Sequence, residues 1–218
     1  MRENINENRR VIVFGATGKI GHAIIWEALD RGYQVTAAVR DPQRMKLENE
    51  RLQVITADIL RPDSIAEAAR GHDAIVSAYG PQFGAEEELL EVARCLIEGA
   101  RRAEVPRLLI VGGAGSLKVE SGDRLMDTPE FPEELRPLAQ AHADAYDIYK
   151  EADVSWTYFS PAALIEEGRR FGNFRIGTDQ LVTDELGNSK ITIADYAAAM
   201  MDELDEGHFE RTRFTVGY

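Results

Sequence analysis

The segment that most restricts the fold of this chain is a short apolar run that leads directly into three evenly spaced glycines. Residues 11–14 are all apolar and predict a buried strand, and Gly15, Gly18 and Gly21 follow at once. Residues 19–31 then carry apolar side chains at helical spacing. A strand, a glycine turn and a helix in immediate succession are typical of the first unit of a parallel α/β sheet.

The spacing of the glycines predicts a turn that binds a dinucleotide. Gly15 permits the tight turn, Gly18 lets a pyrophosphate approach the backbone, and Gly21 lets the helix lie close against the strand. Unpaired N–H groups at the helix N-terminus and the helix dipole favour the negative charge of phosphates. Lys19 is equally consistent with a second phosphate-facing cation and with a solvated surface charge. The candidate ligands in this turn are Gly15, Thr17, Gly18, Lys19 and Ile20.

The length and composition fit one folded domain. The chain has 218 residues, of which 44% are hydrophobic and 29% charged, as is typical of globular proteins. Residues 1–9 are polar and mixed in charge, so we expect a short flexible arm there. We expect residues 10–218 to form a single domain.

Charge and cysteine content limit the partners. The formal net charge of −13 argues against a nucleic-acid partner, which requires a basic surface. No apolar run is long enough to span a membrane. Cys95 is the only cysteine, so no disulfide can form within the chain, and a cytoplasmic location is expected. The four histidines lack ligand spacing, so no metal site is predicted. The oligomeric state stays open.

Strand-like and helical patterns alternate along the rest of the chain. Apolar, β-branched runs lie at 11–14, 34–39, 53–56, 74–78, 107–112, 154–159 and 213–216. Helical patterns lie at 19–31, 42–49, 63–70, 86–103, 138–152 and 194–206. This alternation predicts an α/β protein with the Rossmann fold, a doubly wound parallel sheet covered by helices on both faces.

Two glycine-rich segments interrupt the alternation, at 113–136 and 160–190. Both follow the carboxyl ends of predicted strands, which is where open α/β sheets bind ligands. Long loops in compact domains are often functional, although they can be plain surface excursions. We therefore expect the two segments to form walls on the substrate side of the site.

The ends of the second and third strands carry candidate groups for the adenosine half of a dinucleotide. Arg40 suits a 2′-phosphate and favours NADP(H), whereas Asp41 beside it could bind the ribose and permit NAD(H). Asp58 could accept a hydrogen bond from the adenine amino group while Ile59 packs beside the ring. Asp58 is equally suited to cap the helix that follows it.

The later strand ends carry candidates for the nicotinamide half. After the fourth strand, the segment Ala78, Tyr79 and Gly80 would let a cofactor cross the sheet edge, with Tyr79 near the nicotinamide. Gly113 and Ser116 follow the fifth strand, where the Ser116 hydroxyl could polarise a substrate carbonyl or only bond to the loop backbone. The turn after the sixth strand could hold the nicotinamide through its backbone and comprises Pro161, Ala162 and Ala163.

A helical segment then places His142, Tyr146 and Lys150 on one face, since they are four residues apart. Tyr146 and Lys150 match the Tyr-x-x-x-Lys pattern of short-chain dehydrogenases, in which the lysine lowers the pKa of the phenol for acid–base work. A core-facing tyrosine with a lysine extending past it gives the same pattern. The catalytic candidates are Tyr146, Lys150 and Ser116.

The chain resembles the atypical short-chain dehydrogenase/reductases over almost its whole length. It is most similar to the NADH-flavin reductase group, relatives of biliverdin-IXβ (flavin) reductase and of the NmrA-like regulators. The matching segments are 15–21, 39–42, 112–117, 127–129, 156–162, 177–179 and 195–197.

The resemblance implies a Rossmann domain that binds NAD(P)H and passes a hydride to a small acceptor, a flavin, a quinone or a related molecule. Members of this group often lack the Tyr-x-x-x-Lys pair, so the match at Tyr146 and Lys150 can be accidental. Two alternatives stay open: a regulatory protein that senses NADP(H) without turnover, and a sugar-nucleotide epimerase or dehydratase of the extended type.

Overall fold

The computed structural model describes residues 9–218. The predicted arm at 1–9 therefore lies outside the described residues, apart from Arg9, whose guanidinium pairs with Asp205 at 2.9 Å. Within the described part of the chain, no helix is both long and apolar enough to cross a membrane.

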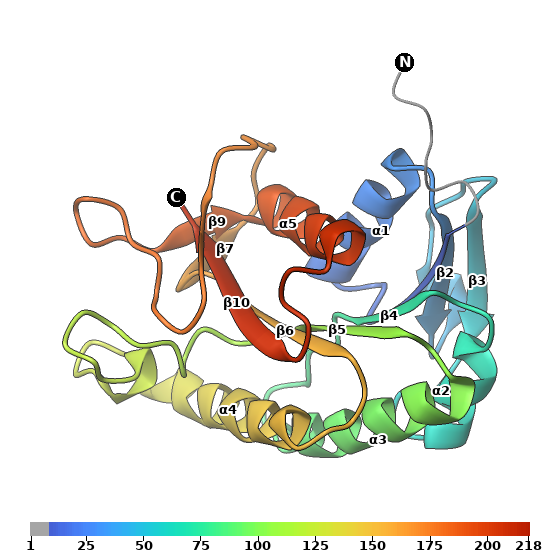
Figure 1. The fold of residues 1–218 in the computed structure, drawn as a ribbon, viewed down its shortest axis with the longest axis horizontal. Helices are drawn as coiled ribbons and strands as arrows, with labels where there is room; N and C mark the ends of the chain where they lie inside the picture. Colours follow the sequence, from blue (N-terminus) through green and yellow to red (C-terminus); the bar gives the residue numbers. More distant parts are fainter. Residues whose placement is uncertain (1–8) are drawn as a thin grey trace.

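Eight strands form the main sheet in the order β3–β2–β1–β4–β5–β6–β10–β8 (Figure 1). Seven of them run parallel, and β8 pairs antiparallel with β10 at the edge. The strands are β1 (Arg10–Phe14), β2 (Gln34–Val39), β3 (Leu52–Thr56), β4 (Ala74–Ser77), β5 (Arg107–Val111), β6 (Trp156–Ser160), β8 (Arg175–Gly177) and β10 (Thr212–Gly217).

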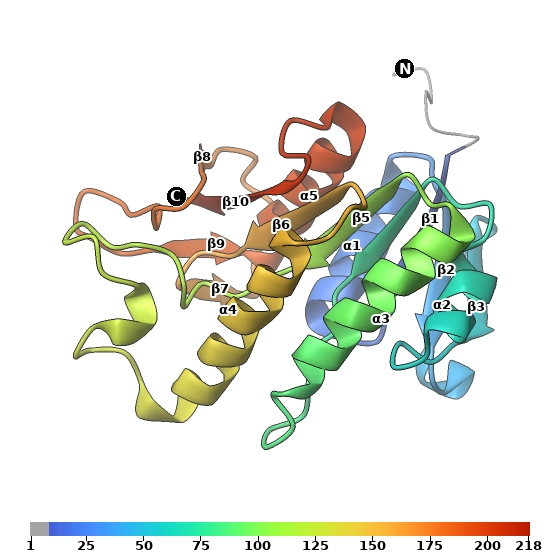
Figure 2. The ribbon, with the colours of Figure 1, turned by 60° about the horizontal axis from the view of Figure 1, so that its bottom comes forward.

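Helices cover both faces of this sheet (Figures 1 and 2). One face carries α1 (Lys19–Asp30) and α5 (Ile193–Glu206), which pack against each other. The other carries α2 (Pro62–Ala69), α3 (Glu88–Ala103) and α4 (Arg136–Lys150) side by side. The predicted doubly wound Rossmann fold is thus confirmed.

The apolar run in β1 shows why the sheet has two cores. Successive side chains of a strand point to opposite faces. Val11 and Val13 accordingly join the core under α1 and α5, while Ile12 and Phe14 join the core under α2 and α3. All four are buried, which is why the run is continuously apolar rather than alternating.

The strand order reverses between β1 and β4. The chain runs outward from β1 through β2 to β3, then returns to the other side of β1 to form β4. The connections after β1 and β4 therefore leave in opposite directions and open a crevice at the carboxyl edge of the sheet, where such folds bind ligands.

The predicted helix at 42–49 is wrong. Only a short 3₁₀ turn, Pro42–Arg44, forms there, and Met45 already has an extended backbone. Met45, Leu47 and Asn49 are half-buried in strict alternation with exposed neighbours, which is the period of an extended chain. Two apolar side chains were too few to separate this period from a helical one.

The two glycine-rich segments contain short elements that the sequence pattern did not indicate. Segment 113–136 holds two 3₁₀ turns, Leu125–Asp127 and Glu133–Leu135. Segment 160–190 supplies β8 and β7 (Leu164–Glu166), and β7 pairs in parallel with β9 (Lys190–Thr192).

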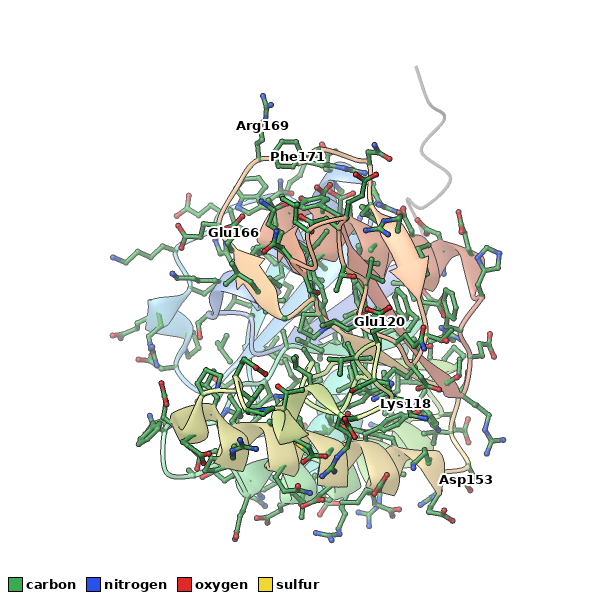
Figure 3. All side chains as sticks on the ribbon, turned by 90° about the vertical axis from the view of Figure 1, so that its left-hand side faces the viewer. Lys118, Glu120, Asp153, Glu166, Arg169 and Phe171 are labelled. Atoms are coloured by element: carbon green, nitrogen blue, oxygen red, sulfur yellow. The ribbon has the colours of Figure 1, made fainter. Side chains whose placement is uncertain are left out.

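The two segments also pack against each other. The backbone N–H of Lys118 donates to the carbonyl of Asp179 at 2.8 Å, and that of Leu181 donates to the carbonyl of Lys118 at 2.8 Å. Figure 3 views this end of the molecule, with Lys118 of the first segment and Glu166 of the second among its labelled residues. The segments thus form one continuous layer beside the sheet.

Candidate functional site

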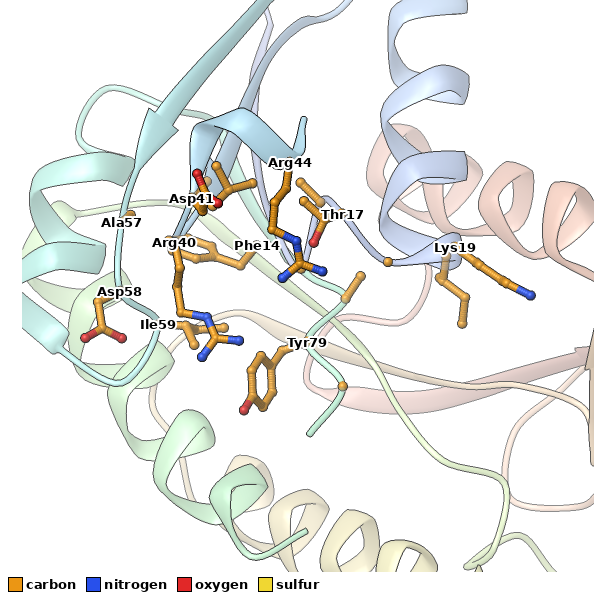
Figure 4. A pocket seen from close by; sticks show the side chains of 18 of the residues that line it. Phe14, Thr17, Lys19, Arg40, Asp41, Arg44, Ala57, Asp58, Ile59 and Tyr79 are labelled. Carbon is orange, nitrogen blue, oxygen red and sulfur yellow. The ribbon is translucent and has the colours of Figure 1, made fainter. Parts of the chain in front are cut away.

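A cavity of about 550 Å³ opens at the carboxyl edge of the sheet, at the point where the strand order reverses (Figure 4). Its lining comes mainly from the segments that follow β1, β2, β3 and β4. The structure brings together here the predicted residues Gly15, Thr17, Gly18, Lys19, Ile20, Arg40, Asp58, Ile59, Ala78, Tyr79 and Gly80.

The glycine turn has the geometry that its spacing predicted. Gly15 has a φ of +76°, and a Cβ there would lie 2.3 Å from the carbonyl oxygen of Ala78. A Cβ on Gly21 would lie 2.3 Å from the carbonyl oxygen of Gly15, so α1 could not pack this closely with any other residue. A Cβ on Gly18 would lie 3.4 Å from its nearest contact, the carbonyl oxygen of Gly15, so the backbone at Gly18 is not crowded by other parts of the chain.

The start of α1 suits a phosphate. Gly18 is the N-cap residue, and no side chain caps the first turn of the helix. The first N–H groups of a helix have no intrahelical acceptor, so an anion at this position would satisfy them. The first turn also contains no acidic residue that would repel a phosphate.

Two arginines converge on the cavity from the end of β2. The guanidinium groups of Arg40 and Arg44 both point into it in Figure 4, and neither forms an ion pair with a described residue. The Asp41 carboxylate instead accepts a hydrogen bond from the N–H of Gln43 at 3.1 Å and caps the 3₁₀ turn. Asp41 also lines the cavity, so the end of β2 presents two guanidinium groups and one carboxylate that is engaged in this turn.

Asp58 and Ile59 lie on the same side of the cavity as Arg40. The Asp58 carboxylate accepts from the N–H of Leu60 at 3.0 Å, and its own N–H donates to the Ser64 hydroxyl at 2.9 Å. The N-cap residue of α2 is Arg61, and no side chain caps that helix. The alternative role of Asp58 as the helix cap is therefore wrong, while the contact with adenine stays a prediction.

Tyr79 lies beside Arg40 and Ile59 in the cavity (Figure 4). Its hydroxyl donates to the carboxylate of Glu88 on α3, which holds the ring in this position. Burial, followed by the bond to Glu88, raises the pKa of Tyr79 to about 12. The expected place of Tyr79 beside the nicotinamide stays a prediction.

Lys19 points away from the cavity in Figure 4 and pairs with Glu167 at 2.6 Å, with both side chains about three-quarters exposed. This placement fits the surface-charge interpretation of Lys19. The cavity lining also includes two apolar residues from later in the chain, Ile165 of β7 and Ile193 at the start of α5. Sequence reasoning missed both isoleucines because they reach the cavity only through tertiary packing.

The remaining predicted cofactor ligands lie outside the cavity lining. A Cβ on Gly113 would lie 2.8 Å from the His142 side chain, so this glycine serves close packing against α4. Pro161 and Ala162 are buried, and the N–H of Ala163 donates to the Ser189 hydroxyl at 3.1 Å. Their role as backbone ligands of a nicotinamide stays a prediction.

The three catalytic candidates gather around Arg213 of β10 rather than around the cavity. The guanidinium of Arg213 donates to the Ser116 hydroxyl at 2.8 Å and to the Asp179 carboxylate at 3.1 Å through Nε. Its central carbon lies 4.7 Å from the centre of the Tyr146 ring. Ser116 therefore helps Arg213 to fasten both glycine-rich segments to the sheet.

Tyr146 packs on the face of the sheet that α4 covers, with its ring centre 4.9 Å from that of Tyr158, the middle residue of β6. Its ring packs edge-on against Trp156, the first residue of β6, at 6.0 Å between ring centres. The Lys150 ammonium pairs with Asp147 at 2.6 Å. Burial raises the pKa of Tyr146 and outweighs the opposing effects of Arg213 and Lys150. Lys150 lowers this pKa as expected, but the effect of burial is larger, and the catalytic roles of the pair stay predictions.

A parallel sheet with this strand order, a glycine turn at a helix N-terminus and a cavity across the reversal point define a dinucleotide-binding Rossmann protein. The model of the NAD(P)H-binding family matches residues 15–206. The chain belongs to this NAD(P)H-binding family, which confirms the resemblance found in the sequence.

Three relatives cover nearly the whole chain. An uncharacterised protein of Bacillus subtilis, YwnB, is 39% identical over 95% of this chain and 97% of its own length. The crystal structure of a proposed epimerase from Bacteroides thetaiotaomicron is 42% identical and superimposes with a TM-score of 0.89, covering 96% and 97% of the two chains. A proposed NADH-flavin reductase from Streptococcus pneumoniae is 34% identical, with a TM-score of 0.86 and coverage of 96% and 99%.

Proposed function

We propose that this protein is an NADPH-dependent reductase that transfers a hydride to a flavin, a quinone or a similar small acceptor. The observation that carries the cofactor preference is the pair of unpaired arginines, Arg40 and Arg44, at the end of β2. A 2′-phosphate is a dianion that guanidinium groups bind well, and the Asp41 carboxylate, which also lines the cavity, is engaged in the 3₁₀ turn. The resemblance to the NADH-flavin reductase group supports the acceptor class.

Different residues of the cavity would bind different parts of the dinucleotide. The N–H groups after Gly18 would hold the pyrophosphate, Arg40 and Arg44 the 2′-phosphate, and Ile59 one face of the adenine. Ile165 and Ile193 would shield the nicotinamide end from water. Bound NADPH would supply the hydride, and the protein would mainly hold the two reacting rings in contact. Such a transfer requires no acid–base side chain at the cavity.

The placement of Ser116, Tyr146 and Lys150 away from the cavity favours one alternative, a regulator that binds NADP(H) without turnover. The same placement is least favourable to an epimerase or dehydratase, which would need Tyr146 as a working acid–base group.

The deciding experiment is NADPH oxidation by the purified protein with and without added FMN, with NADH in parallel. Oxidation that needs both protein and FMN, and that is faster with NADPH, supports the proposal. Tight NADPH binding without oxidation by FMN or a quinone would replace it with the regulatory function. Faster oxidation of NADH would overturn the cofactor preference.

A further inference from the structure

A second open cavity, of about 420 Å³, lies between α2 and the strands β1, β2 and β3. Along β3 it lies next to the dinucleotide cavity, because Thr56 lines the second cavity and Ala57 lines the first. Figure 2 shows α2 beside β3 at this edge of the sheet. Nothing in the proposed reductase function uses this cavity.

Two arginines of the second cavity have no carboxylate partner. Arg10 stands at the start of β1 and Arg70 directly after α2, and neither side chain forms an ion pair with a described residue. A Cβ on Gly71 would lie 3.4 Å from Nη1 of Arg10, so this guanidinium lies against the turn that carries Arg70. Two arginines without an ion-pair partner among the described residues thus line one cavity, in a chain of net charge −13.

His72 sits at the base of this cavity and is 7% exposed. Its Nδ1 lies 3.2 Å from the carbonyl oxygen of Ala69, and its Nε2 lies 2.8 Å from the Thr36 hydroxyl. A carbonyl oxygen can only accept, so Nδ1 carries the hydrogen and Nε2 accepts from Thr36. Burial and then the charge of Arg10 lower the pKa of His72, which keeps the ring neutral.

One carboxylate lies in the lining of the cavity and another lies just outside it. Glu67 of α2 is the one acidic residue in the lining, against the two arginines. Asp73 lies just outside and accepts the backbone N–H of Arg10 at 2.7 Å, although its charge also acts on His72 and raises its pKa. The lining thus carries one more positive than negative charge when His72 is neutral.

We propose that this second cavity binds a small dianion of the phosphate or sulfate class, held between Arg10 and Arg70. Guanidinium groups bind tetrahedral oxyanions through paired N–H donors, and hydroxyl groups such as that of Ser64 in the same lining can add further donors. The dianion would also offset the charge of Arg10 that acts on His72. His72 is therefore a built-in reporter of occupancy.

The test is an NMR titration of the full chain with inorganic sulfate, at constant ionic strength set by chloride, observing the His72 ring signal. The signal is assigned from its loss in His72→Gln. We expect a saturable shift and a pKa of His72 that rises with sulfate. Arg10→Gln and Arg70→Gln should each raise the Kd for sulfate at least about fivefold, as expected when a hydrogen bond to a charged group is lost.

Two further variants make the result specific. Glu67→Gln should lower the Kd for sulfate, because it removes the negative charge in the lining. A general loss of structure would not strengthen binding. Arg94→Gln, an exposed change on α3, should leave the affinity unchanged. The proposal would be overturned if sulfate caused no saturable shift of the His72 signal beyond the shift seen with chloride. A shift that survives the Arg10 and Arg70 changes and is lost in Arg44→Gln would also overturn it, since sulfate would then occupy the dinucleotide cavity.

Discussion

The arginine pair at the end of β2 gives the sharpest prediction about the cofactor. Arg40→Gln and Arg44→Gln each remove a guanidinium that points into the cavity while keeping a polar side chain of similar length. A hydrogen bond to a charged group contributes ~1.5–3 kcal/mol. Each change should therefore raise the Kd for NADPH by about 10- to 100-fold and leave the Kd for NADH almost unchanged.

The assay is a fluorescence titration of each variant with NADPH and with NADH. Because both arginines would hold the same phosphate, their effects should not add, and the double variant should lose less than the sum of the two single losses. Arg94→Gln serves as the control, since Arg94 is exposed on α3 and does not line the cavity. Equal losses of affinity for NADPH and NADH would refute the argument, because NADH lacks the 2′-phosphate that the two arginines would bind.

Three other changes test the remaining parts of the structure. Tyr146→Phe should keep at least half of any NADPH-oxidising activity, because Tyr146 does not line the cavity; an inactive but folded variant would restore its catalytic role. Gly21→Ala should abolish NADPH binding and lower the melting temperature, since its Cβ would lie 2.3 Å from a backbone oxygen; unchanged values would contradict the close packing of α1. Asp195→Asn should cost about 1–3 kcal/mol at pH 7, as its buried carboxylate accepts N–H bonds from Phe171 and Gly172.

The loss of stability at low pH should depend on the carboxylate of Asp195. Hydrogen bonds from Tyr218, Gly172, Phe171 and Thr192 outweigh the effect of burial and lower the pKa of Asp195. A lowered pKa in the folded state gives stability that is present above the unfolded pKa of about 4 and is lost as the pH falls through the folded value. Asp195→Asn should flatten this fall in a series of denaturant titrations between pH 7 and pH 2, and an unchanged slope would contradict the assignment.

The elements around the glycine turn were predictable because local sequence determines them. The apolar run at 11–14 requires burial on both faces, and the contacts of Gly15 and Gly21 allow no side chain. Arg44 was missed because the segment after Asp41 was assigned to a helix. A better signal was available: Pro42 after a capping aspartate is typical of a short turn, which brings residue 44 back toward residue 40.

The place of Ile165 and Ile193 in the cavity lining was not predictable in this way. Ile165 lies in a three-residue strand that the sequence pattern did not indicate, and Ile193 stands one residue before the predicted helix at 194–206. Their position depends on segment 160–190 folding back over the sheet. The buried Asp195 holds that segment through the N–H groups of Phe171 and Gly172, a contact between distant parts of the chain. Patterns along one strand or helix carry no information about such contacts.

The Tyr-x-x-x-Lys match shows how position along a helix decides whether a motif can act. A helix that connects two parallel strands runs antiparallel to them, so the start of α4 lies near the carboxyl edge of the sheet. Tyr146 comes ten residues after Arg136, the first residue of α4. At 1.5 Å per residue this is a distance of about 15 Å. The Tyr146 ring lies 4.9 Å from that of Tyr158, the middle residue of β6, and 6.0 Å from that of Trp156, so Tyr146 packs on the face of the sheet and not at its carboxyl edge. A tyrosine level with the carboxyl end of β5 would have to stand near His142, which faces Gly113, and no tyrosine precedes Tyr146 in α4.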